Sequence, residues 1–166
     1  LKKYTDAKNN LNVLCNGEMN YTIKGVHAKV SVTWNYKAPE GTGDTHYSIM
    51  RGTKASLIIR QGAEQKYKPV LYIEPAKLTP EYEKQVTAIV AKIALQYPGI
   101  SLQKDAKGWE VIIPEKYKEG HESHFARVTE KYIDYLLHHS IPEWEVPNML
   151  AKYYTTTQAY QLANKK

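Results

Sequence analysis

The sequence predicts an α+β domain, with an open-faced and mostly antiparallel sheet of about six strands plus a short β-pair, covered on one face by about three helices. Three observations lead to this prediction. Polar and apolar residues alternate without a break over residues 26–36, which is typical of a strand with one buried face. After residue 79 the apolar spacing changes to that of a helix. Two more stripes with helical spacing end the chain.

Six strands with short connections are expected in the first half of the chain. Asn16-Gly17 is a strong signal for a two-residue hairpin turn, and Lys24-Gly25 marks the next reversal of direction. Arg51-Gly52-Thr53-Lys54 is expected to form the turn of a later hairpin. Connections this short favour a meander of neighbouring antiparallel strands. The strands are expected at residues 11–15, 18–24, 26–36, 45–49, 55–60 and 69–74.

The first helix has clear start and stop signals. Thr79 as N-cap and Pro80 in the first helical position begin it, and Pro98-Gly99 ends it. A short β-pair is expected next, at residues 100–103 and 109–113. The inward stripe of the helix is expected to consist of Tyr82, Val86, Ile89, Val90, Ile93 and Tyr97.

Two helices are expected to close the chain. Ser123 is expected to cap the first of them, and Ile141-Pro142 to end it. Pro147 is expected to open the last helix. Their inward residues are expected to be Phe125, Val128, Tyr132 and Leu136 in one, and Met149, Tyr153 and Tyr160 in the other.

Length and composition indicate one domain of a globular protein. The chain has 166 residues, and no linker or internal repeat divides it. The single cysteine, Cys15, excludes an internal disulfide and a thiolate metal cluster, and its apolar position predicts a buried thiol. No apolar run approaches the roughly 20 residues that span a membrane. Since the chain begins at Leu1 without a signal peptide, we expect a fragment or processed product, and its start indicates neither cytoplasm nor periplasm.

The net charge of +6 does not indicate a nucleic-acid partner. Such a surface requires basic residues in one stripe, among exposed aromatic side chains. Here the lysines and arginines are spread over several expected strands, and most tyrosines fall on the apolar phase. A solvated polar sheet face is the better interpretation, so neither nucleic acid nor a membrane is expected as a partner.

Tyrosine is unusually frequent, with 14 Tyr against one Phe. A phenol hydroxyl in a core must find a hydrogen-bonding partner or reach the edge of the core. This composition favours a thin domain packed against a partner over a thick independent core. Tyrosines expected on inward stripes are Tyr21, Tyr36, Tyr47, Tyr82, Tyr132 and Tyr153.

The residues His121-Glu122-Ser123-His124 place two imidazoles and a carboxylate at the expected start of a helix. Free N–H groups there suit an anionic ligand. The same spacing offers two ligands to a metal ion, but a site needs three or four. The alternative is that Ser123 and Glu122 cap the helix and the histidines flank it, so ligand contact is a hypothesis and no metal is expected.

Two further pairs of acidic and histidine side chains have structural alternatives. Asp44 and His46 fall on one side of an expected strand after a glycine-rich loop, so they could converge on a substrate. An Asx-type turn followed by a solvent-facing histidine is the favoured interpretation. Asp134 and His138 lie one helical turn apart, and chance spacing near a helix C-terminus explains this pair.

Several stretches carry a family resemblance: residues 16–21 (NGEMNY), residues 25–34 (GVHAKVSVTW) and residues 43–55 (GDTHYSIMRGTKA). Residues 51–57 resemble a G-T/S-K-G/A-x-L hairpin, and residues 120–125 (GHESHF), followed by two helices, resemble the family's ending. On these grounds the chain resembles the C-terminal domain of the glucose–fructose oxidoreductase/inositol dehydrogenase/MocA-type (Gfo/Idh/MocA) oxidoreductases, in the putative oxidoreductase C-terminal domain branch from Bacteroidetes.

The resemblance implies a two-domain bacterial parent enzyme. Its N-terminal Rossmann domain would bind NAD(P), and the dinucleotide fingerprint, a Glu-Lys-Pro motif and a D-x-x-x-H catalytic motif would all precede Leu1. Asp134 and His138 have the spacing of the D-x-x-x-H motif but the wrong position in the chain. The catalytic role of that motif is therefore not assigned to them. No complete G-x-G-x-x-G motif occurs in the sequence. We therefore expect no catalytic, cofactor or metal residues in this chain, and no hydride transfer by it alone.

Two alternative functions are expected for this chain. The first is a substrate-binding and oligomerisation domain of an NAD(P)-dependent oxidoreductase that acts on a sugar or polyol and forms a homo-oligomer through the sheet face. The second is a non-catalytic binding or scaffold module whose sheet face pairs with another chain. Under the first, the candidate substrate-binding residues are Asp44, His46, Arg51, His121, Glu122 and His124.

Overall fold

The computed structural model describes residues 5–10, 15–34 and 39–165. The chain divides into two compact units, Lys37–Val128 and a second unit of Leu1–Tyr36 with Thr129–Lys166. The helices and longer strands are β1 (Gly17–Ile23), β2 (Val26–Val32), β3 (His46–Arg51), β4 (Ala55–Gln61), β5 (Val70–Pro75), α1 (Pro80–Gln96), β6 (Ser101–Lys104), β7 (Trp109–Ile112), α2 (His121–His138) and α3 (Glu145–Ala163).

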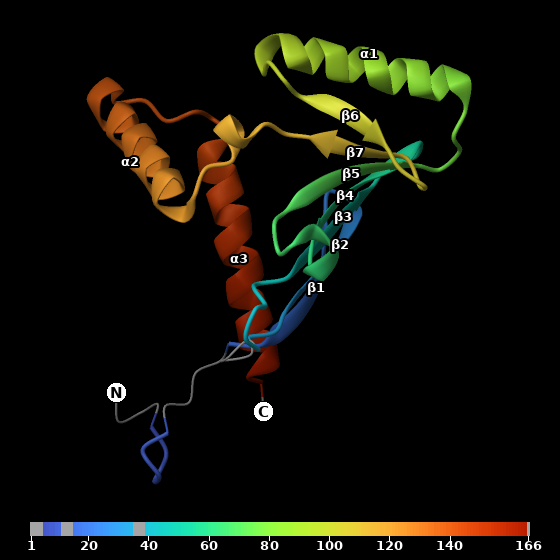
Figure 1. Cartoon of the computed structure of the whole chain (residues 1–166). Helices are drawn as coiled ribbons and strands as arrows, with labels where there is room; N and C mark the ends of the chain where they lie inside the picture. Colours follow the sequence, from blue (N-terminus) through green and yellow to red (C-terminus); the bar gives the residue numbers. More distant parts are fainter. Residues whose placement is uncertain (1–4, 11–14, 35–38, 166) are drawn as a thin grey trace. The chain divides into compact units, whose positions relative to one another are not determined.

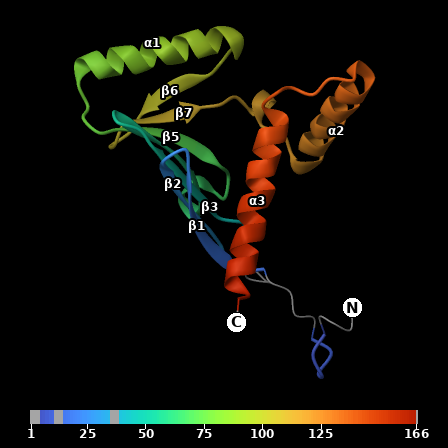
Figure 2. The ribbon, with the colours of Figure 1, turned by 180° about the vertical axis from the view of Figure 1, so that it is seen from behind.

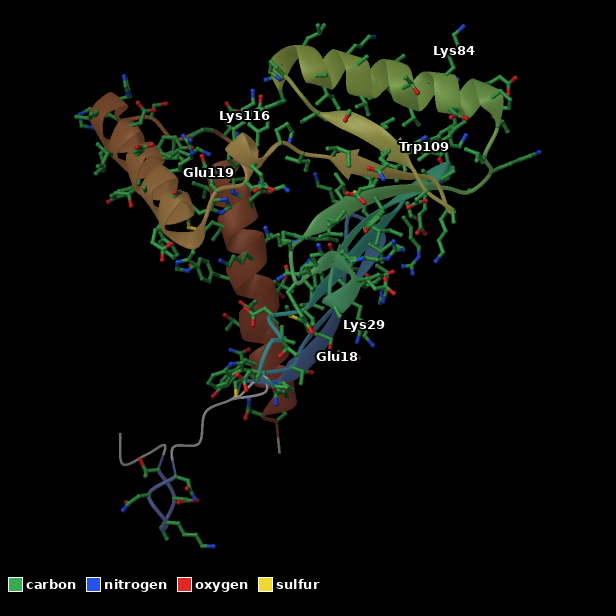
Figure 3. The ribbon with its side chains drawn as sticks, viewed as in Figure 1. Glu18, Lys29, Lys84, Trp109, Lys116 and Glu119 are labelled. Carbon is green, nitrogen blue, oxygen red and sulfur yellow. The ribbon has the colours of Figure 1, made fainter. Side chains whose placement is uncertain are left out.

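Strands β1 and β2 form an antiparallel hairpin in which Ile23 pairs with Val26. Lys24-Gly25 makes the two-residue turn with φ angles of 47° and 78°, the left-handed conformation that this type of turn requires. Glu18 and Lys29, labelled in Figure 3, form an ion pair of 2.8 Å across the two strands. The predicted reversal at Lys24-Gly25 is confirmed.

A five-stranded antiparallel sheet, in the order β3-β4-β5-β7-β6, is the framework of the unit Lys37–Val128. β3, β4 and β5 follow one another as the predicted meander, and the predicted short pair β6–β7 extends the sheet beyond β5 (Figure 1). Leu71 of β5 pairs with Val111 of β7, which pairs in turn with Leu102 of β6. The predicted α+β class and open antiparallel sheet are confirmed.

Helix α1 lies along the β6–β7 end of this sheet in both views of the ribbon (Figures 1 and 2). The Thr79 hydroxyl caps it by accepting a hydrogen bond of 3.2 Å from the N–H of Tyr82. Val86 and Val90 of α1 and Trp109 of β7 form the buried core of this layer. Partly buried apolar side chains packed around that core are Ile73, Tyr82, Ile100 and Leu102.

The opposite face of the five-stranded sheet is covered by no α-helix of this unit among its described residues. Since side chains alternate along a strand, Ile73 and Trp109 point toward α1, and their neighbour Tyr72 points to the other face. We call this other face the open face. The register assigns to it Tyr47, Ile49, Arg51, Ser56, Ile58, Arg60, Val70, Tyr72, Glu74, Ser101, Gln103, Glu110 and Ile112.

The two C-terminal helices differ from the predictions in burial and in three boundaries. α2 ends at His138, before Ile141-Pro142, and α3 begins at Glu145, before Pro147. α2 begins at His121, before Ser123, because the Gly120 carbonyl already accepts the N–H of His124 at 3.1 Å. Apolar spacing predicted the stripes correctly but not their burial, because spacing does not define what covers a stripe. The exposed side chains expected to face inward are Phe125, Val128, Tyr132, Leu136, Met149, Tyr153 and Tyr160.

Five further expectations need correction or lie outside the described residues. Cys15 is exposed and not buried, because β1 begins only at Gly17 and Cys15 precedes the strand. Tyr47 is exposed because it projects from the open face. The strand expected at 11–15 falls mostly outside the described residues, as does Tyr36. On α1, the outer members of the expected stripe are exposed, namely Ile89, Ile93 and Tyr97.

Candidate functional site

The six candidate substrate residues lie in two separate places, and all six are exposed. One group lies at β3 and the other in the first four residues of α2. Among the described residues, no hydrogen bond or ion pair joins one group to the other. The first group consists of Asp44, His46 and Arg51, and the second of His121, Glu122 and His124.

The pleat of β3 separates His46 from Arg51. His46 pairs with Gln61 and lies on the α1 side of the sheet, whereas Arg51 pairs with Ser56 and lies on the open face. Asp44 precedes the strand, and its main-chain carbonyl accepts a hydrogen bond of 3.0 Å from the Gln61 amide. A ligand on one face of the sheet therefore contacts His46 or Arg51, but not both.

The start of α2 presents two imidazoles and a carboxylate to solvent. The His121 ring packs on the Phe125 ring at a centroid distance of 4.8 Å, and its Nδ1 lies 3.9 Å from Oε1 of Glu122. Farther along the helix, His138 Nδ1 lies 3.0 Å from Oδ1 of Asp134, and both side chains are exposed. These groups can donate and accept hydrogen bonds to a polar ligand.

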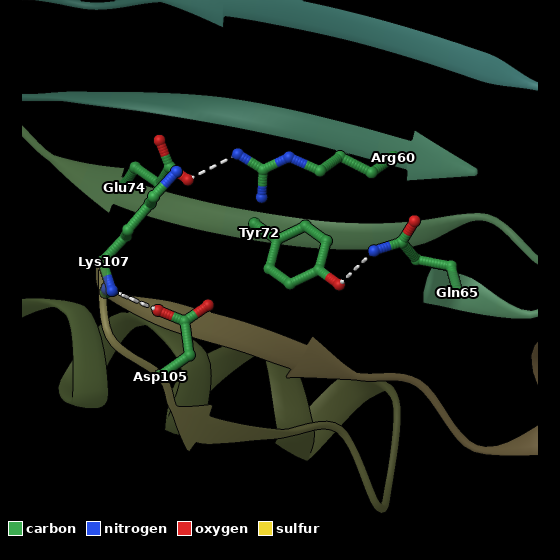
Figure 4. Close-up of polar contacts among 7 residues, drawn as sticks. Arg60, Gln65, Tyr72, Glu74, Asp105 and Lys107 are labelled. Carbon is green, nitrogen blue, oxygen red and sulfur yellow. Dashed lines mark hydrogen bonds and ion pairs between the residues drawn. The ribbon is translucent and has the colours of Figure 1, made fainter. Parts of the chain in front are cut away.

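The most ordered polar arrangement lies on the open face, where Arg60 of β4 contacts two residues of β5 (Figure 4). Arg60 Nη2 donates a hydrogen bond of 2.6 Å to Oε1 of Glu74, and the guanidinium carbon lies 4.8 Å from the centre of the Tyr72 ring. The Gln65 amide donates to the Tyr72 hydroxyl at 3.3 Å. The pair is partly shielded, with side chains 26% and 23% exposed. We call these four residues the open-face network.

The charge of Arg60 is held firmly in this network. The hydrogen bond to Glu74 is the largest cause that raises the pKa of Arg60 above its usual value, and it outweighs the opposing effect of burial. Ile58 lies between Ser56 and Arg60 on the same face and opposite Tyr72, and it is only 2% exposed.

A partial signal for this network lies in the alternation of β4 and β5. Arg60, Tyr72 and Glu74 fall on the polar phase of two strands that were predicted correctly. Alternation alone assigns them to a solvated face. Their contact depends on the pairing register of β4 with β5, which the sequence pattern does not define.

A cavity of about 310 Å³ opens beside the start of α1. Its lining includes Thr53 and Lys54 from the β3–β4 turn, the part of the hairpin motif that carries the family resemblance. Tyr82 and Gln85 line it from α1. The cavity thus combines two ammonium groups, one carboxylate, hydroxyl and amide groups and one aromatic ring.

Two other kinds of site were sought in the described part of the chain. No group of three or more His, Cys, Asp or Glu side chains there could hold a metal ion. None of the helices in residues 5–10, 15–34 and 39–165 has the length and apolar character to cross a membrane.

Comparisons with known proteins agree with the fold. The family described as "Putative oxidoreductase C terminal domain" matches residues 1–164. A crystal structure of a putative oxidoreductase from Parabacteroides merdae matches with 54% sequence identity and a TM-score of 0.90, over 98% of this chain and 38% of that chain. None of the curated proteins compared with the chain matches it. The chain thus spans well under half the length of its structural relative, and it belongs to the putative oxidoreductase C-terminal domain family.

Proposed function

We propose that this chain is the substrate-side and oligomerisation domain of a longer NAD(P)-dependent oxidoreductase that acts on a sugar or polyol. The observation that carries the proposal is the match of nearly the whole chain to part of a putative oxidoreductase, at 54% identity. At that identity a common fold and a related place in the parent protein are expected. The substrate class and the Gfo/Idh/MocA membership come from the resemblance of the sequence motifs.

The chemistry of the exposed candidate residues supports a hydroxyl-rich substrate. A sugar or polyol offers many hydroxyl groups, each of which can donate and accept a hydrogen bond. The start of α2 offers His121, Glu122 and His124, and β3 with its preceding loop offers Asp44 and either His46 or Arg51. We assign substrate contact to these groups within the longer protein.

The open face supports a role in subunit contact. Tyrosine and arginine are enriched in protein interfaces, and this face carries Tyr47, Tyr72, Arg51 and Arg60. On this face the charges of Arg60 and Glu74 are paired with each other. A second copy of the same face is the partner that the proposal assigns.

The described residues do not fit a dinucleotide cofactor. NAD(P) is bound where a parallel strand leads through a glycine-rich turn into a helix N-terminus. In this sheet every pair of described strands is antiparallel, and β5 leads into α1 through a segment that ends in Thr79-Pro80, without glycine. The proposal therefore assigns the cofactor to the rest of the longer protein.

A kinetic experiment tests the proposal on the longer protein. NADH and NADPH binding is measured by fluorescence, and turnover is measured with a panel of sugars and polyols. His121→Ala and Glu122→Gln are expected to raise KM for the active substrate about 5- to 10-fold each, the effect of one lost hydrogen bond. Lys84→Ala, at an exposed position of α1 (Figure 3), is the control and is expected to leave KM unchanged.

Three results would contradict parts of the proposal. Absence of NAD(P)H binding and of turnover in the longer protein would leave the scaffold module as the better interpretation. Turnover with unchanged KM in both α2 variants would remove the start of α2 from the substrate site. A monomeric parent protein in light scattering would contradict the assignment of the open face to subunit contact.

A further inference from the structure

Helix α3 carries five large apolar side chains on one exposed side. At roughly 3.6 residues per turn, these residues fall on one side of the helix. Met149 is 53%, Leu150 65% and Tyr153 59% exposed. We call this set the α3 stripe, and it consists of Val146, Met149, Leu150, Tyr153 and Tyr160.

On the opposite side of α3, Leu162 is 63% exposed, and only small and polar side chains are partly covered. These residues are half-buried, and none of them has a large apolar side chain. A helix at the surface of a complete protein normally shows the reverse arrangement, with large apolar residues covered. The half-buried residues are Ala151, Thr155, Gln158 and Ala159.

Contacts between α2 and the start of α3 hold the helix in this orientation. The Tyr135 hydroxyl donates a hydrogen bond of 3.2 Å to Glu145, and Lys131 lies 3.6 Å from the same carboxylate. The Lys131 ammonium also lies 4.8 Å from the centre of the Trp144 ring. The chain's own side chains therefore anchor the first turn of α3, and the stripe remains exposed.

The composition of the α3 stripe is that of an interface. Tyrosine and methionine are enriched at the centres of protein interfaces, and charged residues lie at the rim. Met149 and Tyr153 lie centrally in the stripe, and the ammonium of Lys152 lies 5.4 Å from the centre of the Tyr153 ring at its border. Exposed apolar surfaces of this kind mark interaction sites.

We propose that the α3 stripe is the docking surface for the part of the longer protein that lies outside this chain. The inference rests on the proposed function, in which this chain is one domain of a longer enzyme. More than half of the Parabacteroides merdae chain lies outside the match, although nearly all of this chain lies within it. A covalently attached segment reaches millimolar effective concentration, which favours it over a second copy as the occupant.

Hydroxyl-radical footprinting of the unaltered longer protein tests this docking, because methionine and tyrosine side chains are oxidised readily when solvent reaches them. The oxidation rates of Met149, Tyr153 and Tyr160 are compared with those in the denatured protein, with Trp109 as the buried reference. If the stripe is docked, its residues are protected as strongly as Trp109, and dilution of the protein leaves the protection unchanged. If the stripe is not docked, its oxidation rates are at most about twofold lower than in the denatured protein, because more than half of each of the three probed side chains is exposed.

A photo-crosslink identifies the occupant. In the variant Tyr153→p-benzoylphenylalanine, the expected crosslinked peptide comes from outside the 166 residues and from the same molecule, while the same substitution at Asn148, on the other side of α3, gives no such peptide. Peptides from residues 5–128 of this chain, peptides from a second isotope-labelled copy, or protection lost on dilution would each overturn the proposal. NAD(P)H binding measured on the same sample reports separately on the proposed function, so the two can fail independently.

Discussion

Arg60 and Glu74 form an ion pair of 2.6 Å although they are not direct cross-strand partners. Arg60 pairs with Val70, and Glu74 pairs with Ser56, so the arginine extends along the strand direction to reach the carboxylate. On its way the guanidinium lies over the Tyr72 ring, at 4.8 Å from its centre. This diagonal contact links β4 to β5 on the open face.

Removing the charge of Glu74 is expected to destabilise the sheet. Glu74→Gln leaves the partly buried Arg60 guanidinium without its anionic partner, which lowers the free energy of unfolding by about 1 kcal/mol. Urea denaturation measures the change. In the control Glu115→Gln, the lost ion pair with Lys118 is largely exposed, and the expected loss in the free energy of unfolding is much smaller than for Glu74→Gln. Equal losses in the two variants would contradict the special role of the open-face pair.

The core between α1 and β7 predicts a larger effect. Val90 is 8% exposed and packs in the cluster with Trp109, so Val90→Ala removes buried methyl groups and leaves a cavity. A loss of about 2 kcal/mol in the free energy of unfolding is expected. Leu95→Ala on the same helix is the control, because Leu95 is 84% exposed and its truncation changes stability by less than about 0.5 kcal/mol. A similar loss for Leu95→Ala would show that this part of α1 is buried in solution.

Signals carried by a few neighbouring residues predicted the local structure well. Thr79 and Pro80 defined the start of α1, where the Thr79 side chain indeed caps the helix. Lys24-Gly25 defined the β1–β2 turn, because a two-residue hairpin requires a left-handed conformation that glycine adopts without strain. Such features depend on backbone preferences within one turn, which the sequence contains in full.

Features that depend on distant residues could not be predicted in the same way. Helical spacing predicted that Tyr132 and Tyr153 share apolar stripes with their neighbours, but both are exposed, because spacing does not define what covers a stripe. Arg60 and Glu74 meet only through the register of two strands. α2 ends at His138, before the predicted stop at Ile141-Pro142, because His139 adopts a left-handed φ of 47° that few residues other than glycine take.

Acid is expected to weaken the contact at the start of α2. The hydrogen bond from Arg127, with Nε 2.8 Å from the carboxylate, is the main cause that lowers the pKa of Glu119 below its usual value of 4.5. A carboxyl group with a lowered pKa in the folded state stabilises the protein above pH 4.5, and this stabilisation is lost as the pH falls through the folded-state pKa.

A carbon-detected NMR titration checks this prediction. Glu119, labelled in Figure 3, is expected to titrate below pH 4.5, and Arg127→Gln is expected to return its pKa toward 4.5. The loss of stability below that pH becomes smaller in the same variant. Lys131→Gln removes a cation from the same helix and is expected to leave the Glu119 titration unchanged. A Glu119 pKa that does not respond to Arg127→Gln would contradict the assigned cause.

The opposite orientations of His46 and Arg51 lead to an unequal effect on substrate binding in the longer protein. Because the two side chains project from opposite faces of β3, one bound sugar or polyol contacts only one of them. His46→Ala or Arg51→Ala, but not both, is therefore expected to raise KM about 5- to 10-fold, as one lost hydrogen bond would. Steady-state kinetics on the two variants, with thermal unfolding to confirm that each remains folded, measure the difference.

A rise in KM for His46→Ala would assign the substrate to the α1 side of the sheet, and a rise for Arg51→Ala to the open face. A rise in both folded variants would contradict the opposed arrangement at the substrate site, and a rise in neither would remove β3 from it.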